Sequence, residues 1–384
     1  MMRKIAVITG TRAEYGILKP VIRAIDAHPE LELSLIVMGM HLLQDFGFTL
    51  REIENDSFEI AAKIEGLYAK DSGEDMARSV GEGIVQLART LVRLKPDVLL
   101  LLGDRGEMLA GAVAATFMNI PIGHIHGGDV SGNVDEPVRH AITKLAHIHF
   151  PATKESAQRI IAMGEDPSYT FTVGAPGLET IFHEKFIEPP VLAEKYHLDL
   201  SQPLLLVLQH PVTTEVDEAP GQIRETLEAI ADLQYQTILI YPNADAGGRR
   251  MIEVIKEYET EKYPFIGTFK SISHEEYLSL MKIASLLVGN SSSGIIEAPS
   301  FGVPVVNIGS RQQGRQRAEN IIDVGYNRAQ IAAAIRTALD DEAFKAKSRS
   351  GKNPYGDGRA GERIAKILAG IKIDKNLLKK RMSY

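Results

Sequence analysis

The segment from residue 286 to residue 299 joins an apolar run to a turn that is rich in hydroxyl groups. The run ends at Gly289, three serines follow (Ser291, Ser292 and Ser293), and apolar residues then recur at helical spacing. This order predicts a strand, a tight turn and the start of a helix. Unbonded backbone N–H groups at a helix start, together with hydroxyl donors, can bind a phosphate without a lysine. The alternative is that one serine only caps the helix.

Polar residues suited to ligand chemistry follow six further apolar runs. These positions are Arg12, the pair Asp104 and Arg105, the segment from His124 to Asp129, His210, Asn243 and Arg311. A guanidinium just past a strand can fork onto a diphosphate or a sugar oxygen, although each arginine could instead form a surface salt bridge. His210 precedes a proline in a loop. The residue could donate a hydrogen bond to a phosphate, or the loop could be an ordinary helix cap. The convergence at strand ends predicts a binding site there.

Two aspartates are candidates for proton transfer. Asp104 follows an uninterrupted aliphatic run, where loss of water would raise the pKa of its carboxyl group and suit it to acid or base work. It could instead cap the helix that follows. Asp135 opens the next predicted helix, where it could reach a ligand or serve as a cap. Arg139 is explained by an i,i+4 ion pair with Asp135.

Histidines gather in one region, with five of the eleven falling between His124 and His149. A His-x-His pair on a strand places both rings on one face, and Asp129 could add an oxygen ligand, so a metal-dependent hydrolase is a rival class. The spaced third and fourth ligands of a zinc signature are missing, and we expect no metal. Imidazoles at a strand end also serve in proton transfer. His147 and His149 are expected to be satisfied histidines of the core or its rim.

Short apolar runs alternate with longer amphipathic ones along the chain, which predicts parallel sheets covered by helices on both faces. The predicted strands of the first half are 4–9, 33–38, 97–102, 120–126, 147–152 and 170–174, and those of the second half are 204–209, 236–241, 265–268, 285–289, 304–308 and 321–324. Two Rossmann-like α/β domains are therefore expected, at residues 1–175 and 176–364, with a ligand bound in the cleft between them. Residues 365–384 are expected to form a helical tail that packs on the first domain.

Composition excludes several classes of protein. With 384 residues, 24% charged and 44% hydrophobic, the chain suits a soluble two-domain enzyme. A net charge of −7 argues against a nucleic-acid partner, and the absence of cysteine excludes disulfides, thiolate nucleophiles and Cys-ligated zinc. The apolar run near the N-terminus is too short for a signal peptide, and no run reaches the roughly 20 apolar residues of a membrane span. A cytoplasmic location is predicted, with no membrane partner.

Three common motifs are absent from the sequence. No G-x-G-x-x-G follows the first predicted strand, which argues against a tightly held NAD. No G-x-x-x-x-G-K-[ST] loop and no G-x-S-x-G elbow occur either. The readings as an oxidoreductase, an ATPase and a serine hydrolase are all weakened, and no cofactor is expected.

Eight motifs, taken in order, resemble the hydrolysing UDP-N-acetylglucosamine 2-epimerases, the branch that makes N-acetylmannosamine for sialic acid synthesis. The eight motifs are Gly10-Thr11-Arg12-Ala13-Glu14, Gly103-Asp104-Arg105, His124-Ile125-His126-Gly127-Gly128, Ser131-Gly132-Asn133-Val134-Asp135, Arg139-His140-Ala141-Ile142-Thr143-Lys144, His210-Pro211-Val212-Thr213-Thr214, Tyr241-Pro242-Asn243 and Gly289-Asn290-Ser291-Ser292. The resemblance covers residue 3 to about residue 325. It implies a GT-B fold with the active site between two Rossmann-like domains, a UDP-sugar substrate and a homodimer or homotetramer.

The resemblance also implies a mechanism and roles. UDP leaves C1 as the C2 proton is removed, a 2-acetamidoglucal forms, and water adds to release the 2-epimer. Weakening the bond to the diphosphate acidifies the C2 proton, so electrostatic stabilisation of the leaving group is expected to dominate. Asp104 and Asp135 match family carboxylates assigned to proton transfer, and His126 is the third catalytic candidate. The substrate-binding residues it implies are Arg12, Arg105, His210, Asn243, Ser291, Ser292, Glu297 and Arg311.

One residue departs from the sialic acid pattern. Glu stands in those enzymes where this chain has His126, and an imidazole can still move a proton although it is not a permanent anion. Histidine here resembles relatives that act on UDP-N,N′-diacetylbacillosamine for legionaminic acid. UDP-N-acetylglucosamine is nevertheless placed first, because the segment from Ser131 to Asp135 resembles the sialic acid form. A GT-B glycosyltransferase and a non-enzymatic nucleotide-sugar binding module are the alternatives from other classes.

Overall fold

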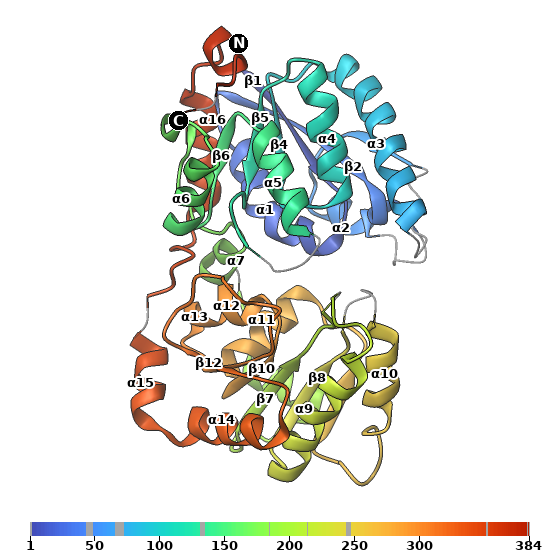
Figure 1. Cartoon of the computed structure of the whole chain (residues 1–384), viewed down its shortest axis with the longest axis vertical. Helices are drawn as coiled ribbons and strands as arrows, with labels where there is room; N and C mark the ends of the chain where they lie inside the picture. The colour runs from blue at the N-terminus through green and yellow to red at the C-terminus, as the bar shows by residue number, and fades with distance from the viewer. Residues whose placement is uncertain are drawn as a thin grey trace. The chain divides into compact units, whose positions relative to one another are not determined.

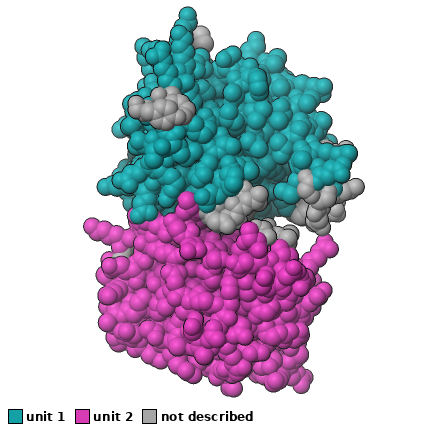
Figure 2. Space-filling model, viewed as in Figure 1, with its two compact units in different colours: residues 1–129, 135–182, 355–384 teal, residues 130–134, 183–354 magenta. Residues whose placement is uncertain are grey.

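The computed structural model describes residues 2–43, 49–65, 73–130, 135–183, 185–212, 214–242, 247–350, 352–381 and 383. The chain forms two compact units, which Figure 2 colours separately. Unit 1 comprises residues 1–129, 135–182 and 355–384, and unit 2 comprises residues 130–134 and 183–354. No helix among the residues described has both the length and the apolar character needed to cross a membrane.

Unit 1 is built on a parallel six-stranded sheet (Figure 1). Its strands are β1 (Arg3–Thr9), β2 (Leu31–Met38), β3 (Ile60–Ile64), β4 (Val98–Leu102), β5 (Ile122–Ile125) and β6 (Ile148–Phe150). Its helices are α1 (Arg12–Asp26), η1 (Gly39–Leu42), α2 (Leu50–Asn55), α3 (Gly73–Leu94), α4 (Gly106–Phe117), α5 (Asp135–Leu145), α6 (Lys154–Ala162), η3 (Pro167–Tyr169), α7 (Leu178–His183), α16 (Ala360–Gly370) and α17 (Lys375–Leu378).

Unit 2 repeats this plan with a second parallel six-stranded sheet. Its strands are β7 (Leu204–Leu208), β8 (Gln236–Ile240), β9 (Ile266–Phe269), β10 (Leu286–Gly289), β11 (Val305–Ile308) and β12 (Ile321–Val324). Its helices are α8 (Pro189–Tyr196), α9 (Ala219–Leu233), α10 (Gly248–Lys256), α11 (His274–Ile283), α12 (Ser293–Ile296), α13 (Ala298–Phe301), α14 (Arg328–Asp340) and α15 (Glu342–Ser350).

Both faces of each sheet are buried. In β1, Ile5 and Val7 pack in one cluster with α1 and α16, while Ala6 and Ile8 pack on the other face with α3 and α4. Helix α16 lies against α1, although the two helices are far apart in sequence (Figure 1). Burial on both faces explains why the strands are continuous apolar runs, as the sequence predicted for a doubly wound fold.

Two strand predictions differ from the structure. The segment predicted as a strand at 170–174 forms only an isolated bridge between Thr170 and His149. The edge strand β3 was not predicted, because its sequence Ile-Ala-Ala-Lys-Ile has a charged residue and two alanines instead of a branched apolar run.

The strand order defines one special position in each sheet. The orders are β3-β2-β1-β4-β5-β6 and β12-β11-β10-β7-β8-β9, so the direction of winding reverses between β1 and β4 and between β7 and β10. Sheets of this kind bind ligands outside the carboxyl ends of the strands where the order reverses. We call these two places switch point 1, after β1 and β4, and switch point 2, after β7 and β10.

Candidate functional site

Asp104 and Arg139 form an ion pair at switch point 1. Asp104 lies two residues past β4, and its Oδ2 accepts a hydrogen bond from Nη2 of Arg139, which is buried and lies on α5. The N-cap of α4 is Arg105, so Asp104 does not cap that helix. The sequence explained Arg139 only by its spacing from Asp135. In the structure its Nη1 also donates to the backbone oxygen of Asp129 at 2.8 Å, which joins the ends of β4 and β5 through α5.

His126 and Asp129 form a second polar pair at the end of β5. Nδ1 of His126 lies 3.0 Å from Oδ2 of Asp129, and the side chains are 13% and 10% exposed. Oδ1 of Asp129 accepts a hydrogen bond of 2.6 Å from the hydroxyl of Ser156. The sequence analysis considered Asp129 only as a metal ligand. The structure instead gives it both a histidine and a serine as partners.

His124 is a structural residue. Its Nε2 lies 2.7 Å from the backbone oxygen of Gly103 and its Nδ1 lies 3.1 Å from the hydroxyl of Thr143. Burial lowers the pKa of His124 to about 3, so the ring is neutral at neutral pH. Both ring nitrogens are thus engaged within unit 1, and no group of three or more potential metal ligands occurs in the part of the chain that the structure describes.

The two arginines that the sequence placed near the diphosphate lie on the surface of unit 1. Arg12 begins α1 and pairs with Glu52 of α2 at 3.0 Å, with both side chains almost half exposed. Arg105 lies 3.5 Å from Glu107 and donates to the sulfur of Met40 at 3.7 Å. Exposed pairs such as that of Arg12 and Glu52 contribute about 0.2–1 kcal/mol, so a ligand phosphate could displace Glu52 from Arg12 at small cost.

Glu14 is a buried carboxyl group beside these arginines. It is 5% exposed, and its Oε1 accepts from the backbone N–H of Gly10 at 3.3 Å. Burial, helped by the negative charge of Glu107, raises the pKa of Glu14 to about 8. Glu14 is therefore mostly protonated at neutral pH, and a neutral group lies beneath the turn after β1.

Glu14→Gln is expected to stabilise the protein at neutral and alkaline pH. The unfolded chain releases the Glu14 proton near pH 4.5 and the folded chain near pH 8, so folded protein binds more protons in that window and loses stability as pH rises. Glutamine stays neutral, so the variant avoids a loss of unfolding free energy on the order of a few kcal/mol at pH 8. Denaturant unfolding of both proteins at pH 5 and pH 8 measures the effect, with the exposed Glu30→Gln as control. An equal pH dependence in wild type and Glu14→Gln would contradict it.

At switch point 2, the serine turn follows β10 as predicted. The hydroxyls of Ser291 and Ser293 lie 2.9 Å apart, and the hydroxyl of the half-buried Tyr277 of α11 lies 2.5 Å from that of Ser293. The N-cap of α12 is Ser292, whose side chain makes no capping bond. The predicted helix is shorter than expected, because α12 ends at Ile296 and a new turn begins near Pro299, which lacks an N–H.

Asn290 connects the two strand ends of switch point 2, and the sequence analysis missed this role. Its Oδ1 accepts from the backbone N–H of His210 at 2.7 Å, and its Nδ2 donates to the backbone oxygen of His210 at 2.8 Å. Its own backbone oxygen accepts from Gln312 at 2.8 Å and from Arg311 at 3.3 Å. Gly289, with φ +132°, permits the close approach to β7, since a Cβ there would lie 2.2 Å from the oxygen of Leu208.

His210 and Arg311 differ in charge at switch point 2. Burial, together with the positive charge of Arg311, lowers the pKa of His210 to about 3. The imidazole is neutral at neutral pH and can donate one hydrogen bond, while Arg311 supplies the positive charge. Glu297 lies between α12 and α13 in the same region. The structure thus brings together four of the predicted binding residues in unit 2: His210, Ser291, Ser292 and Arg311.

Two of the predicted site residues cannot be placed fully. Asn243 lies outside the described residues, and Asp135 is described by its backbone alone, as the first residue of α5. Their roles stay predictions.

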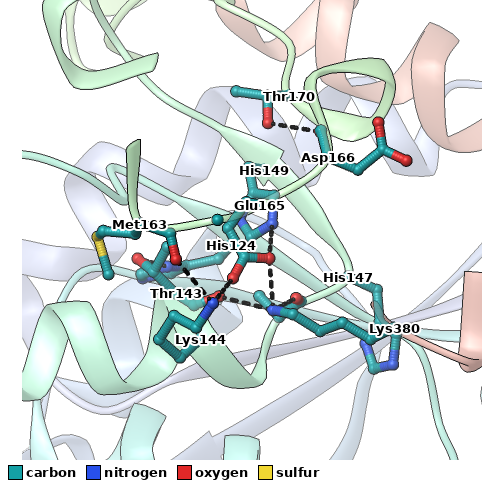
Figure 3. A network of polar contacts seen from close by, with 12 residues as sticks. His124, Thr143, Lys144, His147, His149, Met163, Glu165, Asp166, Thr170 and Lys380 are labelled. Atoms are coloured by element: carbon teal, nitrogen blue, oxygen red, sulfur yellow. Dashed lines mark hydrogen bonds and ion pairs between the residues drawn. The ribbon is translucent and has the colours of Figure 1, made fainter. Parts of the chain in front are cut away.

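An ionic network around the buried Glu165 lies at the C-terminal end of α5 (Figure 3). Glu165, 3% exposed, accepts hydrogen bonds from Lys144 at 2.5 Å and from His149 at 3.1 Å, and its Oε2 lies 2.6 Å from Nζ of Lys380. Burial alone would raise the pKa of Glu165, but these three donors lower it to about 2. Lys380 also donates to the backbone oxygens of Thr143 and Ala146 at the end of α5. Nδ1 of His147 accepts from the N–H of Ile122, so His147 is a satisfied histidine, as predicted. His149 is satisfied only in part, because its Nε2 is bonded to Glu165 while its buried Nδ1 has no hydrogen-bond partner among the described residues.

Comparison with known proteins agrees with this architecture. The model of the UDP-N-acetylglucosamine 2-epimerase family matches residues 23–369. A UDP-N,N′-diacetylbacillosamine 2-epimerase (hydrolyzing) of Legionella pneumophila is 41% identical over 384 residues, which cover 100% of both chains. A UDP-N-acetylglucosamine 2-epimerase of Neisseria meningitidis is 34% identical over 368 residues, covering 96% of this chain and 95% of the relative.

Solved structures share the fold. The UDP-GlcNAc 2-epimerase from Neisseria meningitidis, bound to UDP-GlcNAc, superposes with a TM-score of 0.82 at 18% identity and covers 95% of this chain and 99% of that one. The enzyme from Methanocaldococcus jannaschii, in complex with UDP-GlcNAc and UDP, has a TM-score of 0.77 at 21% identity, again over 95% and 99%. The two-unit α/β architecture is therefore the GT-B fold of these enzymes. With a family model spanning most of its length and a full-length relative at 41% identity, this chain belongs to the UDP-N-acetylglucosamine 2-epimerase family.

Proposed function

We propose that this protein is a hydrolysing 2-epimerase that converts a UDP-activated N-acetylamino sugar and water into UDP and the free 2-epimeric sugar. The observation that carries the proposal is the pair of switch points, each with a different chemistry. At switch point 1 Asp104 is paired to Arg139, and at the end of the neighbouring strand β5 His126 is hydrogen-bonded to Asp129. Switch point 2 has hydroxyl, imidazole and guanidinium donors.

The donors of switch point 2 suit a leaving diphosphate. Ser291 and Ser292 offer hydroxyls, His210 a neutral imidazole and Arg311 a positive charge. We assign these residues to the nucleotide, together with Arg12, Arg105, Asn243 and Glu297 from the family motifs. Stabilising the departing UDP weakens the C1–O bond, which makes the C2 proton more acidic.

We assign proton transfer at the sugar to Asp104, His126 and Asp135. One base removes the C2 proton, the C–H electrons form the C1–C2 double bond, and the C1–O electrons leave with UDP. Hydration of this 2-acetamidoglucal adds a proton to the opposite face of C2 and hydroxide to C1. The sum of both steps is one water consumed, one UDP released and C2 inverted.

We place UDP-N,N′-diacetylbacillosamine first among the substrates and UDP-N-acetylglucosamine second, the reverse of the order that the sequence motifs suggested. The relative at 41% identity over both full lengths is named for the former. A relative of Campylobacter jejuni named GDP/UDP-N,N′-diacetylbacillosamine 2-epimerase (hydrolyzing) is 35% identical over 327 residues, 85% of each chain. The relative named for UDP-N-acetylglucosamine is at 34%. A cytoplasmic location and a homodimer or homotetramer complete the proposal.

One assay separates the candidate functions. The protein is incubated in D₂O, without an acceptor, with each of three nucleotide sugars: UDP-N,N′-diacetylbacillosamine, UDP-N-acetylglucosamine and GDP-N,N′-diacetylbacillosamine. The proposal expects free nucleotide and a free 2-epimer that carries one deuterium at C2, as seen by mass spectrometry and NMR. Turnover only after addition of an acceptor would show a glycosyltransferase, and persistence of intact nucleotide sugar would show a binding module.

A further inference from the structure

We propose that Asp129 is the positioning residue that makes His126 a base, and that Nε2 of His126 is the atom that removes the C2 proton. The inference rests on the proposed function and names the atom that does this step. It explains how an imidazole can stand where the sialic acid enzymes carry a glutamate. His126 and Asp129, acting as a pair, take the place of that glutamate.

The hydrogen bond between the two side chains fixes the tautomer of His126. Its Nδ1 lies 3.0 Å from Oδ2 of Asp129. An ionised carboxylate only accepts hydrogen bonds, so Nδ1 carries a proton, and in the neutral ring Nε2 keeps its lone pair. A neutral imidazole in this tautomer is a base at Nε2, and the adjacent carboxylate stabilises the imidazolium that forms.

The backbone of the turn aims the His126 ring. His126 has φ +60°, in the left-handed region that few residue types adopt. It follows β5 directly, so the alternation of the strand does not place its ring with that of His124, which is engaged with Gly103 and Thr143. A conformation of this kind persists only where the surroundings hold it.

Asp129 is itself held from several sides, as a positioning residue must be. Ser156 of α6 donates to its Oδ1 at 2.6 Å, and Arg139 of α5 donates to its backbone oxygen at 2.8 Å. Arg159 donates to the backbone oxygen of Gly128. Gly128, with φ +76°, lets the turn lie against α6, because a Cβ there would be 2.3 Å from the oxygen of Ser156.

The proton and electron balance of the step is complete with these groups. Nε2 takes the C2 proton and becomes part of an imidazolium, the C2–H electron pair becomes the C1–C2 double bond, and the C1–O pair departs on the UDP oxygen. The imidazolium then loses its proton to solvent before the next turnover. The carboxylate of Asp129 stays ionised throughout.

Asp129→Asn is the test variant. An asparagine keeps the size of the side chain but can donate to Nδ1 through its amide, which moves the ring proton to Nε2 and removes the base. The expected result is a loss of kcat of about 100-fold or more, with KM and the Kd for UDP within about threefold of wild type. Asp166→Asn is the matched control, because Asp166 also lies in unit 1 and accepts from a serine hydroxyl, that of Ser168 at 2.7 Å. Its kcat should equal that of wild type.

A double-mutant cycle distinguishes positioning from a general structural effect. If Asp129 acts only through His126, then adding Asp129→Asn to His126→Ala changes kcat by less than about threefold. A further loss as large as in the wild-type background would overturn the proposal, as would a single Asp129→Asn variant with wild-type kcat.

The tautomer provides a readout that does not need activity. In protein labelled with ¹⁵N-histidine, the signals missing from His126→Ala identify His126. Wild type is expected to show the proton on Nδ1, and Asp129→Asn is expected to show it on Nε2. An Nε2–H tautomer in wild type would overturn the inference, even if the protein proved to have another function. Absence of UDP release by wild type would overturn the proposed function instead.

Discussion

Asp104→Asn is expected to reduce kcat by at least about 100-fold while the Kd for UDP stays within about threefold of wild type. Asparagine has nearly the shape of aspartate and can accept a hydrogen bond from Arg139, but it cannot accept a proton. The ion pair with Arg139 orients the carboxylate at switch point 1. Turnover is measured by UDP release, and affinity by calorimetry with UDP.

The same strand supplies the control for this variant. Asp97 precedes β4 at the end of the strand opposite to Asp104, is exposed, and accepts a hydrogen bond of 2.8 Å from the backbone N–H of Lys4. Asp97→Asn should leave both kcat and the Kd for UDP unchanged. A tenfold loss of UDP affinity in Asp104→Asn would make Asp104 a nucleotide ligand instead of a proton carrier.

Glu165→Gln is expected to have the largest effect on stability, a loss of about 3–5 kcal/mol at pH 7. The substitution leaves the partly buried Lys144 and Lys380 without their shared carboxylate, and the C-terminal segment of unit 1 then loses an ion pair with Glu165 (Figure 3). Denaturant unfolding at pH 7 measures the loss. Glu155→Gln is the control, because Glu155 is exposed on the neighbouring helix α6.

The pH dependence of this variant has a definite sign. The pKa of Glu165 is about 2 in the folded state against 4.5 for the ordinary group, so its contribution is present above pH 4.5 and is lost as pH falls towards 2. The difference in stability between wild type and Glu165→Gln should therefore shrink across this range. A difference that stayed constant down to pH 2 would show that ionisation of Glu165 is not its source.

Local patterns predicted most of the strands and placed the chemistry at their ends. In a parallel α/β fold the apolar run, the turn residues and the amphipathic stretch that follows are adjacent in sequence, so Asp104, His210 and the serine turn could each be found without coordinates. The edge strand β3 escaped because its burial depends on α3 and β2 packing around it rather than on its own composition.

The partners of these residues could not be predicted in the same way. The spacing of Arg139 from Asp135 was enough to explain Arg139 as an ion-pair partner, and Asp129 was interpreted as a possible metal ligand. Neither interpretation predicted the contacts with Asp104 and His126 that the structure shows. Asn290 is an ordinary turn residue in the sequence. Its importance lies in two hydrogen bonds to the backbone of His210, 80 residues away.

By itself the sequence determined that the chain forms two doubly wound α/β units, and it determined which side chains follow their strands. The spacing of apolar residues and the residue types of turns are local properties of the chain. Only the tertiary structure decided that β1 lies beside β4 and β7 beside β10, and that Arg139 and Asp129 hold Asp104 and His126. Strand order and helix docking minimise the free energy of the whole packed unit, and residues 35 or 80 positions apart carry no local signal of meeting.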